Sequence, residues 1–185
     1  MPDIVPVKPS VEKAIGLDYK SDGLFMDSNG HIEDIPHFYR VAQRKRTKLQ
    51  RRLSKKHGSR KGEHKSMNFM KQLRRVNRQS THIANQRKDY LHKLSTEIAN
   101  RCDAICVEDL DMKAMSNKGF GNGKATMDNG YGMFQNVLEY KLSERGKHFV
   151  KVDKWFPSSQ ICHCCGHQQP MPLKIRVYQC PECGM

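Results

Sequence analysis

A short apolar run that ends in acids, Ala104 to Glu108, sets the tightest limit on how this 185-residue chain can fold. Four consecutive apolar residues, two of them β-branched, are typical of a strand that is buried on both faces of a sheet. A second apolar run, Ala14 to Leu17, ends in the same way at Asp18. Because helical patterns separate the two runs, the order of elements predicts a mixed α/β sheet with a crossover connection.

Asp18 and Glu108 each stand where a predicted strand ends, at the sheet edge where ligands and chemistry gather in α/β proteins. If the two strands are neighbours, the carboxylates converge and repel unless a proton or a cation such as Mg²⁺ or Mn²⁺ compensates. The alternative is that an acid after a strand only caps a helix or lies in a solvated turn, which we expect for Asp109 and Asp111. The pattern alone leaves both interpretations open for the pair.

The positive charge of the chain is concentrated in one segment. The formal net charge is +14, yet residues 40–93 alone hold 19 Lys and Arg against two acids, Glu63 and Asp89, a local net charge of +17. A solvated helix face is the simple explanation, but this excess is larger than solubility requires and predicts a polyanion partner such as DNA or RNA. We expect the following arginines to contact phosphate: Arg44, Arg46, Arg51, Arg52, Arg74, Arg75 and Arg78.

Local patterns place the other elements. Residues 1–12, with three prolines, are expected to form a leader or linker. An Asn29-Gly30 turn between two short strand patterns, 23–27 and 31–35, predicts a hairpin after a first strand at 13–18. Three helices are expected, at residues 38–57, 69–98 and 133–145. A last strand is expected at 148–153. Residues 113–132, rich in Gly and Asn, are expected to be a flexible loop, either an ordinary surface loop or a lid over the acids.

Two Cys-x-x-Cys pairs, Cys162 with Cys165 and Cys180 with Cys183, are each followed by glycine. Four thiolates at this spacing predict tetrahedral Zn²⁺ in a zinc ribbon over residues 158–185, where the metal contributes folding free energy to a small module. Disulfides are the alternative, but five of the seven cysteines cluster in residues 162–183, which favours a metal site in the reducing cytoplasm. No run is apolar enough for a membrane span or a secretory signal, so no membrane partner is expected.

Three stretches together resemble the TnpB (OrfB) proteins of insertion sequences: Gly16 to Asp18, Ile105 to Met115, and Val152 to Cys162 with its Trp-Phe-Pro-Ser-Ser run. That family is described as transposases and is related to type V CRISPR effectors. The resemblance covers nearly all of residues 13–185. It implies an RNase H-like (RuvC) nuclease fold in which three carboxylates hold two divalent metals, Mg²⁺ or Mn²⁺, and cut DNA under the direction of a guide RNA. Asp18 and Glu108 correspond to the first and second carboxylates.

The resemblance also implies that parts of the family pattern are missing. The family's third carboxylate follows the zinc ribbon, and its N-terminal half helps to hold guide and target. We therefore expect residues 13–157 to be an incomplete RuvC-like domain, truncated at both ends, which binds DNA or RNA while cleavage is lost or greatly reduced. A non-cleaving zinc-ribbon binding module or repressor is the alternative, as is a product without selected function, and whether the chain is an enzyme stays open.

Overall fold

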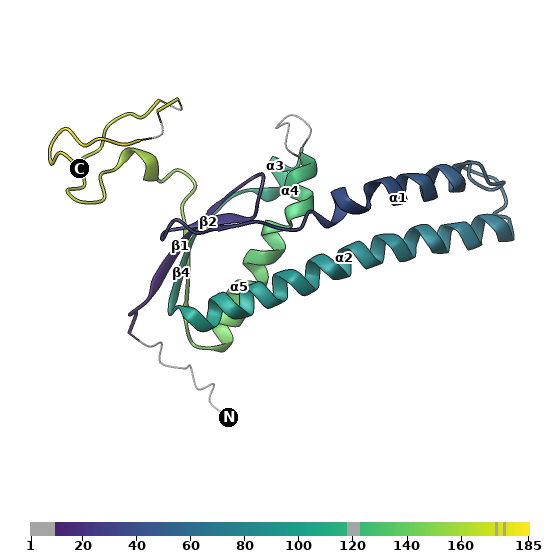
Figure 1. Cartoon of the computed structure of the whole chain (residues 1–185), viewed down its shortest axis with the longest axis horizontal. Helices are drawn as coiled ribbons and strands as arrows, with labels where there is room; N and C mark the ends of the chain where they lie inside the picture. Colours follow the sequence, from purple (N-terminus) through teal and green to yellow (C-terminus); the bar gives the residue numbers. More distant parts are fainter. Residues whose placement is uncertain (1–9, 118–122, 173, 176) are drawn as a thin grey trace. The chain divides into compact units, whose positions relative to one another are not determined.

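The structure is a computed structural model that describes residues 10–117, 123–172, 174, 175 and 177–185 (Figure 1). Contacts divide the chain into two compact units between Lys151 and Val152. The sequence places its boundary a few residues later, after residue 157. No helix in the described ranges is both long enough and apolar enough to cross a membrane.

A five-stranded sheet forms the centre of the first unit, in the order β3-β2-β1-β4-β5. Its strands are β1 (Ala14–Tyr19), β2 (Phe25–Asp27), β3 (Ile32–Glu33), β4 (Ala104–Glu108) and β5 (His148–Val152). β1 pairs parallel with β4 and antiparallel with β2, and β2 pairs antiparallel with β3. The predicted mixed α/β class and the predicted hairpin are therefore both confirmed.

Helices α2 (Met67–Arg101) and α5 (Tyr131–Glu144) supply the rest of the core. The buried cluster joins side chains of β1, β2 and β4 to one face of each helix. It comprises Leu17, Leu24, Phe25, Ile35, Leu91, Leu94, Ile98, Ala99, Cys102, Ile105, Val107, Tyr131, Phe134, Leu138 and Leu142. The apolar periodicity that predicts these two helices thus also marks the faces that they bury.

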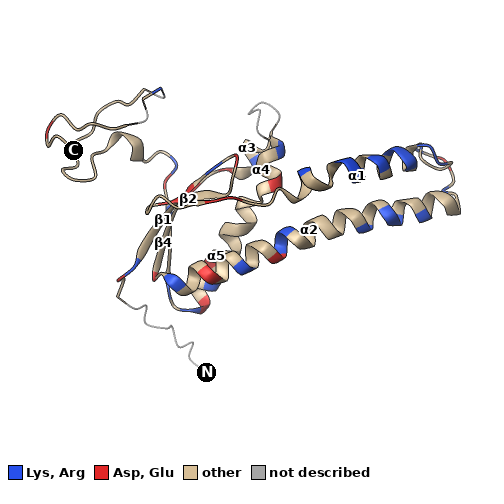
Figure 2. Ribbon diagram, viewed as in Figure 1, with Lys and Arg blue, Asp and Glu red and all other residues tan. Residues whose placement is uncertain are grey.

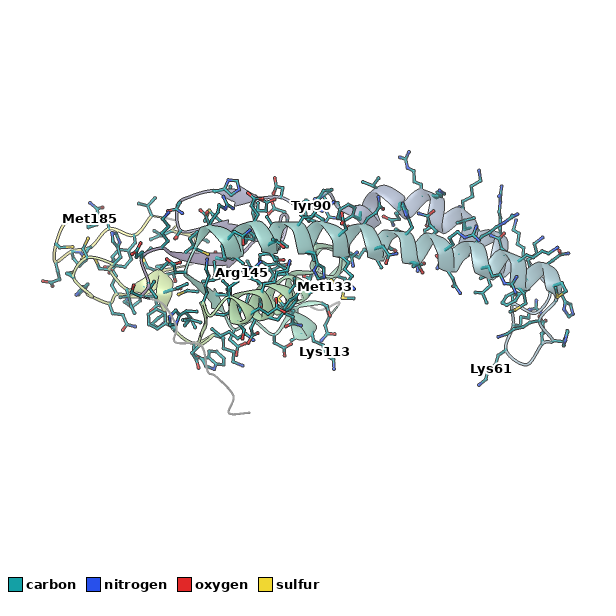
Figure 3. All side chains as sticks on the ribbon, turned by 90° about the horizontal axis from the view of Figure 1, so that it is seen from below. Lys61, Tyr90, Lys113, Met133, Arg145 and Met185 are labelled. Atoms are coloured by element: carbon teal, nitrogen blue, oxygen red, sulfur yellow. The ribbon has the colours of Figure 1, made fainter. Side chains whose placement is uncertain are left out.

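The N-terminal half of α2 packs on α1 (Phe38–Ser54) instead of on this core, and the two helices form a long hairpin (Figure 1). The 35 residues of α2 make it about 50 Å long. Ser66 caps its first turn by accepting from the Phe69 amide at 3.1 Å, and the Gln72 side chain donates to the Leu49 carbonyl at 2.9 Å. Lys61 lies in the connection at the far end of the hairpin (Figure 3).

The prediction of a loop over residues 113–132 is wrong for most of that range. The segment contains α3 (Met112–Met115) and α4 (Gly123–Asn129), and α5 already begins at Tyr131; residues 118–122 lie outside the described part. Buried side chains of α4 stabilise it through bonds to distant segments, and such tertiary contacts override weak local propensity. Asp111 is confirmed as a helix cap, since it accepts from the Ala114 amide at 2.9 Å.

Candidate metal and nucleic-acid sites

Asp18 and Glu108 leave the sheet side by side. Leu17 lies opposite Val107 in the parallel ladder of β1 and β4, so the next residue of each strand is an acid. Residues at the same level of paired strands project to the same face. The two strands are therefore neighbours, which is the condition under which the sequence predicts that the two carboxylates converge. We call Asp18 and Glu108 the carboxylate edge.

The electrostatics of the carboxylate edge favour a bound cation. Partial loss of solvent raises the pKa of Asp18, although a hydrogen bond from the Tyr19 amide opposes this in part. Loss of solvent also raises the pKa of Glu108, and the negative charge of Asp18 raises it further. Ionisation of both carboxyls thus costs more free energy in the folded protein than in water. A cation between them would lower that cost. Asp18 keeps contact with solvent and Glu108 is half-buried, so an ion can reach them.

Two carboxylates are few ligands for a hard divalent cation, which takes six or more oxygens. Asp111 is occupied as the cap of α3. Within the ranges that the structure describes, only the four cysteines form a group of three or more metal-ligating side chains within reach of one ion. Water would therefore have to complete the coordination of any ion at the carboxylate edge.

Lys and Arg residues recur along both helices of the hairpin (Figure 2), and their exposed side chains form two rows. We call the first row the α1 row. Its residues follow three- and four-residue steps along one exposed face of α1. Together with Gln43 and Thr47 they line a shallow open depression. It consists of Arg40, Arg44, Lys48, Arg51, Arg52 and Lys55. Three of these were predicted, and the same four-residue spacing from Arg44 would have found Arg40 and Lys48.

Arg46, a predicted phosphate contact, does not belong to the α1 row. Its guanidinium donates to the Tyr39 hydroxyl at 3.4 Å and to the Gln50 side chain at 3.5 Å, and it lies 5.5 Å from the centroid of the Tyr39 ring. These contacts turn the guanidinium toward its own helix, with Nη1 as the donor in both hydrogen bonds. A phosphate contact of Arg46 stays a prediction.

The second row lies on α2, where all three predicted residues, Arg74, Arg75 and Arg78, are exposed. Phe69, Gln72 and Val76 from the same stretch are buried. The arginines therefore occupy the side of α2 that does not pack on α1, and their charge is available to a partner. Guanidinium groups bind phosphate strongly, through paired N–H donors.

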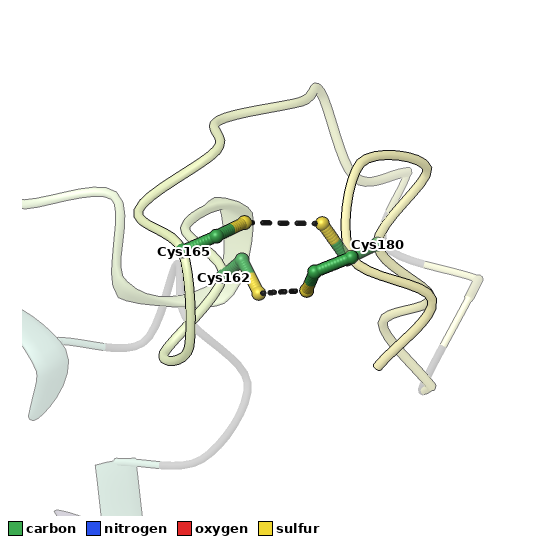
Figure 4. Close-up of side chains that lie close together, drawn as sticks. Cys162, Cys165 and Cys180 are labelled. Atoms are coloured by element: carbon green, nitrogen blue, oxygen red, sulfur yellow. Dashed lines mark hydrogen bonds between the residues drawn. The ribbon is translucent and has the colours of Figure 1, made fainter.

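The second unit brings the four predicted cysteines together (Figure 4). Their Sγ atoms all lie within 4.8 Å of one another, with Cys162 to Cys183 and Cys165 to Cys180 both at 3.5 Å. Four sulfurs around tetrahedral Zn²⁺ lie about 3.8 Å apart, since each is about 2.3 Å from the ion, so this cluster fits a metal and not disulfides. Backbone amides of Cys165 and Cys164 lower the pKa of the Cys162 thiol to about 6, whereas side-chain hydrogen bonds within the cluster raise the pKa of Cys165 and of Cys183. Without a cation the four sulfurs therefore do not all ionise together, and a bound metal ion would supply the missing positive charge.

Two family models match the chain. A model described as "Probable transposase" (OrfB) matches residues 2–119, more than half of the chain, and one described as "Cas12f1-like, TNB domain" matches residues 131–185. The chain belongs to the TnpB (OrfB) family. The family resemblance seen in the sequence is thereby confirmed.

Relatives of this TnpB-family chain agree with the assignment. A "Putative RNA-guided DNA endonuclease" of Streptomyces pristinaespiralis is 32% identical over 183 residues, which cover 98% of this chain and 44% of the relative. A second protein with that description, InsQ of Escherichia coli strain K12, is 31% identical over 176 residues, which cover 88% of this chain and 42% of the relative. The chain thus spans less than half the length of these curated relatives.

Solved structures support the fold of the TnpB-family chain. A Cas12f1–sgRNA–target DNA complex aligns with a TM-score of 0.54 at 18% identity, over 96% of this chain and 47% of the other. A CRISPR-Cas12f ternary complex aligns with a TM-score of 0.55 at 20% identity, over 100% of this chain and 38% of the other. At this level of identity the similarity shows a shared fold.

Proposed function

We propose that this chain provides an RNase H-like (RuvC) portion of a TnpB-type DNA endonuclease, with the carboxylate edge as its metal site and the hairpin as its nucleic-acid contact. The observation that carries the proposal is the parallel pairing of β1 with β4, which sets Asp18 beside Glu108. The raised pKa values of both acids support it, as do the descriptions of the relatives as RNA-guided DNA endonucleases. DNA is the proposed substrate and a guide RNA a proposed partner.

Mg²⁺ or Mn²⁺ is the ion that we propose for the carboxylate edge, because both prefer carboxylate and water oxygens. Such an ion supplies an activated water and neutralises charge on a phosphodiester. The chain's own contribution is to hold Asp18 and Glu108 at one level of a rigid sheet. Since two carboxylates leave most of the coordination to water, we expect one weakly held ion and little or no cleavage from these residues alone.

The test is Mn²⁺ binding, measured by calorimetry with and without DNA. We expect Asp18→Asn and Glu108→Gln each to weaken binding by at least tenfold, since each removes one charged ligand and keeps its shape. Asp109→Asn, an exposed acid on the same segment, should bind Mn²⁺ like the wild type. If Asp18→Asn and Glu108→Gln bind as well as the wild type, the carboxylate edge is not a metal site. Intact DNA binding in that case would favour a non-cleaving binding module.

The proposed contact with nucleic acid is testable through its dependence on salt. Each phosphate contact contributes about 0.9 to the slope of log affinity against log salt on duplex DNA. Replacing Arg74, Arg75 and Arg78 together by Gln should therefore lower the slope by roughly two to three. Arg46→Gln is the matched control, because its guanidinium is already engaged by Tyr39 and Gln50, and it should leave the slope unchanged. An unaltered slope in the triple variant would exclude these three arginines of α2 as phosphate contacts.

For the second unit we propose structural Zn²⁺ on Cys162, Cys165, Cys180 and Cys183, in a zinc ribbon over residues 158–185. The distances among the four sulfurs support a single tetrahedral ion. Four protein ligands close the coordination sphere, so this site serves folding and not catalysis. Reduced thiols are needed for this site, which is why we propose a cytoplasmic location.

A further inference from the structure

The connection between α1 and α2, residues 56–66, concentrates positive charge at the far end of the hairpin, where Lys61 lies in Figure 3. We call this connection the hairpin tip. It holds four Lys and Arg against one acid, Glu63. All four cations are exposed, and every ion pair among the described residues lies elsewhere. Since like charges repel one another, an anionic partner would stabilise this arrangement. The four cations are Lys56, Arg60, Lys61 and Lys65.

One carboxylate holds the hairpin tip in a fixed shape. Oε2 of Glu63 accepts from the backbone amides of Gly58 at 2.9 Å and of Arg60 at 3.4 Å. The Ser66 hydroxyl donates to the His57 carbonyl at 2.9 Å and closes the loop. Gly58 has φ 92°, and a Cβ there would lie 2.7 Å from a carbonyl oxygen across the loop, so a larger residue does not fit. The tip is thus ordered by polar contacts alone, because its sequence contains no apolar side chain.

The same contacts separate the acid of the hairpin tip from its cations. The Glu63 carboxylate is half-buried against the backbone, whereas the four cations point into solvent. The tip therefore presents positive charge in a fixed arrangement. A fixed site loses less conformational entropy on binding than a flexible basic loop does. Such a site suits a regular array of anions, and the phosphate backbone of a nucleic-acid duplex is a regular array.

We propose that the hairpin tip is a separate phosphate-binding site for a nucleic-acid duplex, and that Glu63 is its positioning residue. The inference rests on the proposed role of the hairpin as a nucleic-acid contact. The tip precedes the first residue of α2, and β4 follows the last one, so the 35 residues of α2 place the tip about 50 Å from the start of β4. A duplex that lies along the hairpin would span roughly 15 base pairs over this length, at about 3.4 Å for each pair.

The first test removes charge from the hairpin tip. Lys56, Arg60 and Lys61 are replaced together by Gln, and affinity is measured against salt for a DNA duplex and for an RNA duplex of the same sequence, each of about 20 base pairs so that it covers the hairpin. Each lost phosphate contact lowers the slope of log affinity against log salt by about 0.9 on duplex DNA, so we expect a fall of roughly two to three. A fall with only one duplex would identify that nucleic acid as the ligand.

A matched control removes the same charge elsewhere on the first unit. Lys93, Arg101 and Lys151 each pair with an acid, at 2.7, 3.7 and 3.2 Å. Their joint replacement by Gln changes the net charge as much as the tip variant does. Because these cations lie outside the hairpin tip and already have anionic partners, the control should leave the slope unchanged. An equal fall in both variants would show that net charge alone acts, and the tip would not be a site.

The second test separates the shape of the hairpin tip from its charge. Glu63→Ala and Glu63→Gln both remove one negative charge, so simple attraction should raise the affinity for a duplex equally in both. Gln keeps an oxygen that accepts from the Gly58 amide, and Ala does not. We expect Glu63→Ala to bind about 3- to 10-fold more weakly than Glu63→Gln, because a loosened loop must be ordered on binding.

The outcomes distinguish the hairpin tip from the rest of the hairpin. If the tip variant keeps the wild-type slope on both duplexes while the variant of Arg74, Arg75 and Arg78 lowers it, the tip is refuted and the hairpin contact stands. Equal affinities of Glu63→Ala and Glu63→Gln would overturn the positioning role of Glu63. A wild type whose affinity does not depend on salt would refute the hairpin contact itself.

Discussion

Asp128 on α4 connects three segments through one buried carboxylate. Its two oxygens accept from the amides of Tyr39 and Arg40 at 2.9 and 3.2 Å, and one of them also pairs with the Arg87 guanidinium of α2 at 3.1 Å. His37, at the N-cap of α1, is left-handed with φ 40° and makes no capping bond with its side chain. Asp128 thus takes the place of the missing N-cap, although it is far away in sequence. It accepts hydrogen bonds from two amides in the first turn of α1, which have no acceptor within the helix.

Asp128→Ala should destabilise the first unit severely. The Asp128 side chain is fully buried and that of Arg87 is 18% exposed, so the variant leaves a largely buried cation and two amides without an acceptor. Removal of one partner from such a pair costs about 3–5 kcal/mol, a large part of the roughly 5–15 kcal/mol that holds a domain folded. Asp128→Asn keeps an acceptor oxygen but loses the charge, so about 1.5–3 kcal/mol is expected.

The assay is urea unfolding followed by far-UV circular dichroism, with Asp22→Ala as control. Asp22 is exposed and its ion pair with Lys20 spans 3.7 Å, so its loss should change the free energy of unfolding by less than about 0.5 kcal/mol. Combining Asp128→Ala with Arg87→Met should cost less than the sum of the single variants, because the orphaned cation is gone. An Asp128→Ala protein as stable as the Asp22→Ala control would refute this account of how α4 stabilises α1.

Two further predictions concern the metal sites. Cys180→Ser with Cys183→Ser should abolish zinc content in metal analysis and unfold the second unit, because that unit has few other buried side chains; unchanged zinc would contradict the ligand assignment. Without divalent metal, the free energy of unfolding should fall as pH rises above the ordinary pKa values of 3.8 for Asp18 and 4.5 for Glu108, because the folded state there binds more protons than the unfolded state. Thermal melts from pH 4 to 7 test this, and a slope that Asp18→Asn leaves unaltered would show that the carboxylate edge is not its source.

Local sequence signals predicted those parts of the fold that depend on neighbours in the chain. Apolar runs and three- to four-residue periodicity placed the strands and the three long helices, because each pattern states which side chains must be buried together. The Asn29-Gly30 turn predicted the hairpin, and Gly30 indeed has φ 83°, which glycine adopts without strain. The cysteine spacing predicted the cluster, because each pair is close in sequence.

Signals that depend on distant residues were missed. The sequence of α4 predicts a loop, because the stability of this helix rests on bonds of Asp128 to α1 and α2 and of the Asn129 side chain to the Ser21 carbonyl at 2.9 Å. A count of charges does not tell which way a side chain turns, so it could not show that the Arg46 guanidinium contacts Tyr39 and Gln50.

The sequence by itself determined the α/β class, the basic segment and the four cysteines, because these follow from composition and short spacings, and it indicated the family through the resemblance of three stretches. Only the tertiary structure decided that β1 lies directly beside β4, so that Asp18 and Glu108 share one edge, and that the buried carboxylate of Asp128 finds its partners on α1 and α2. Strand order and the satisfaction of buried polar groups depend on which distant segments pack together, and no local pattern of residues contains that information.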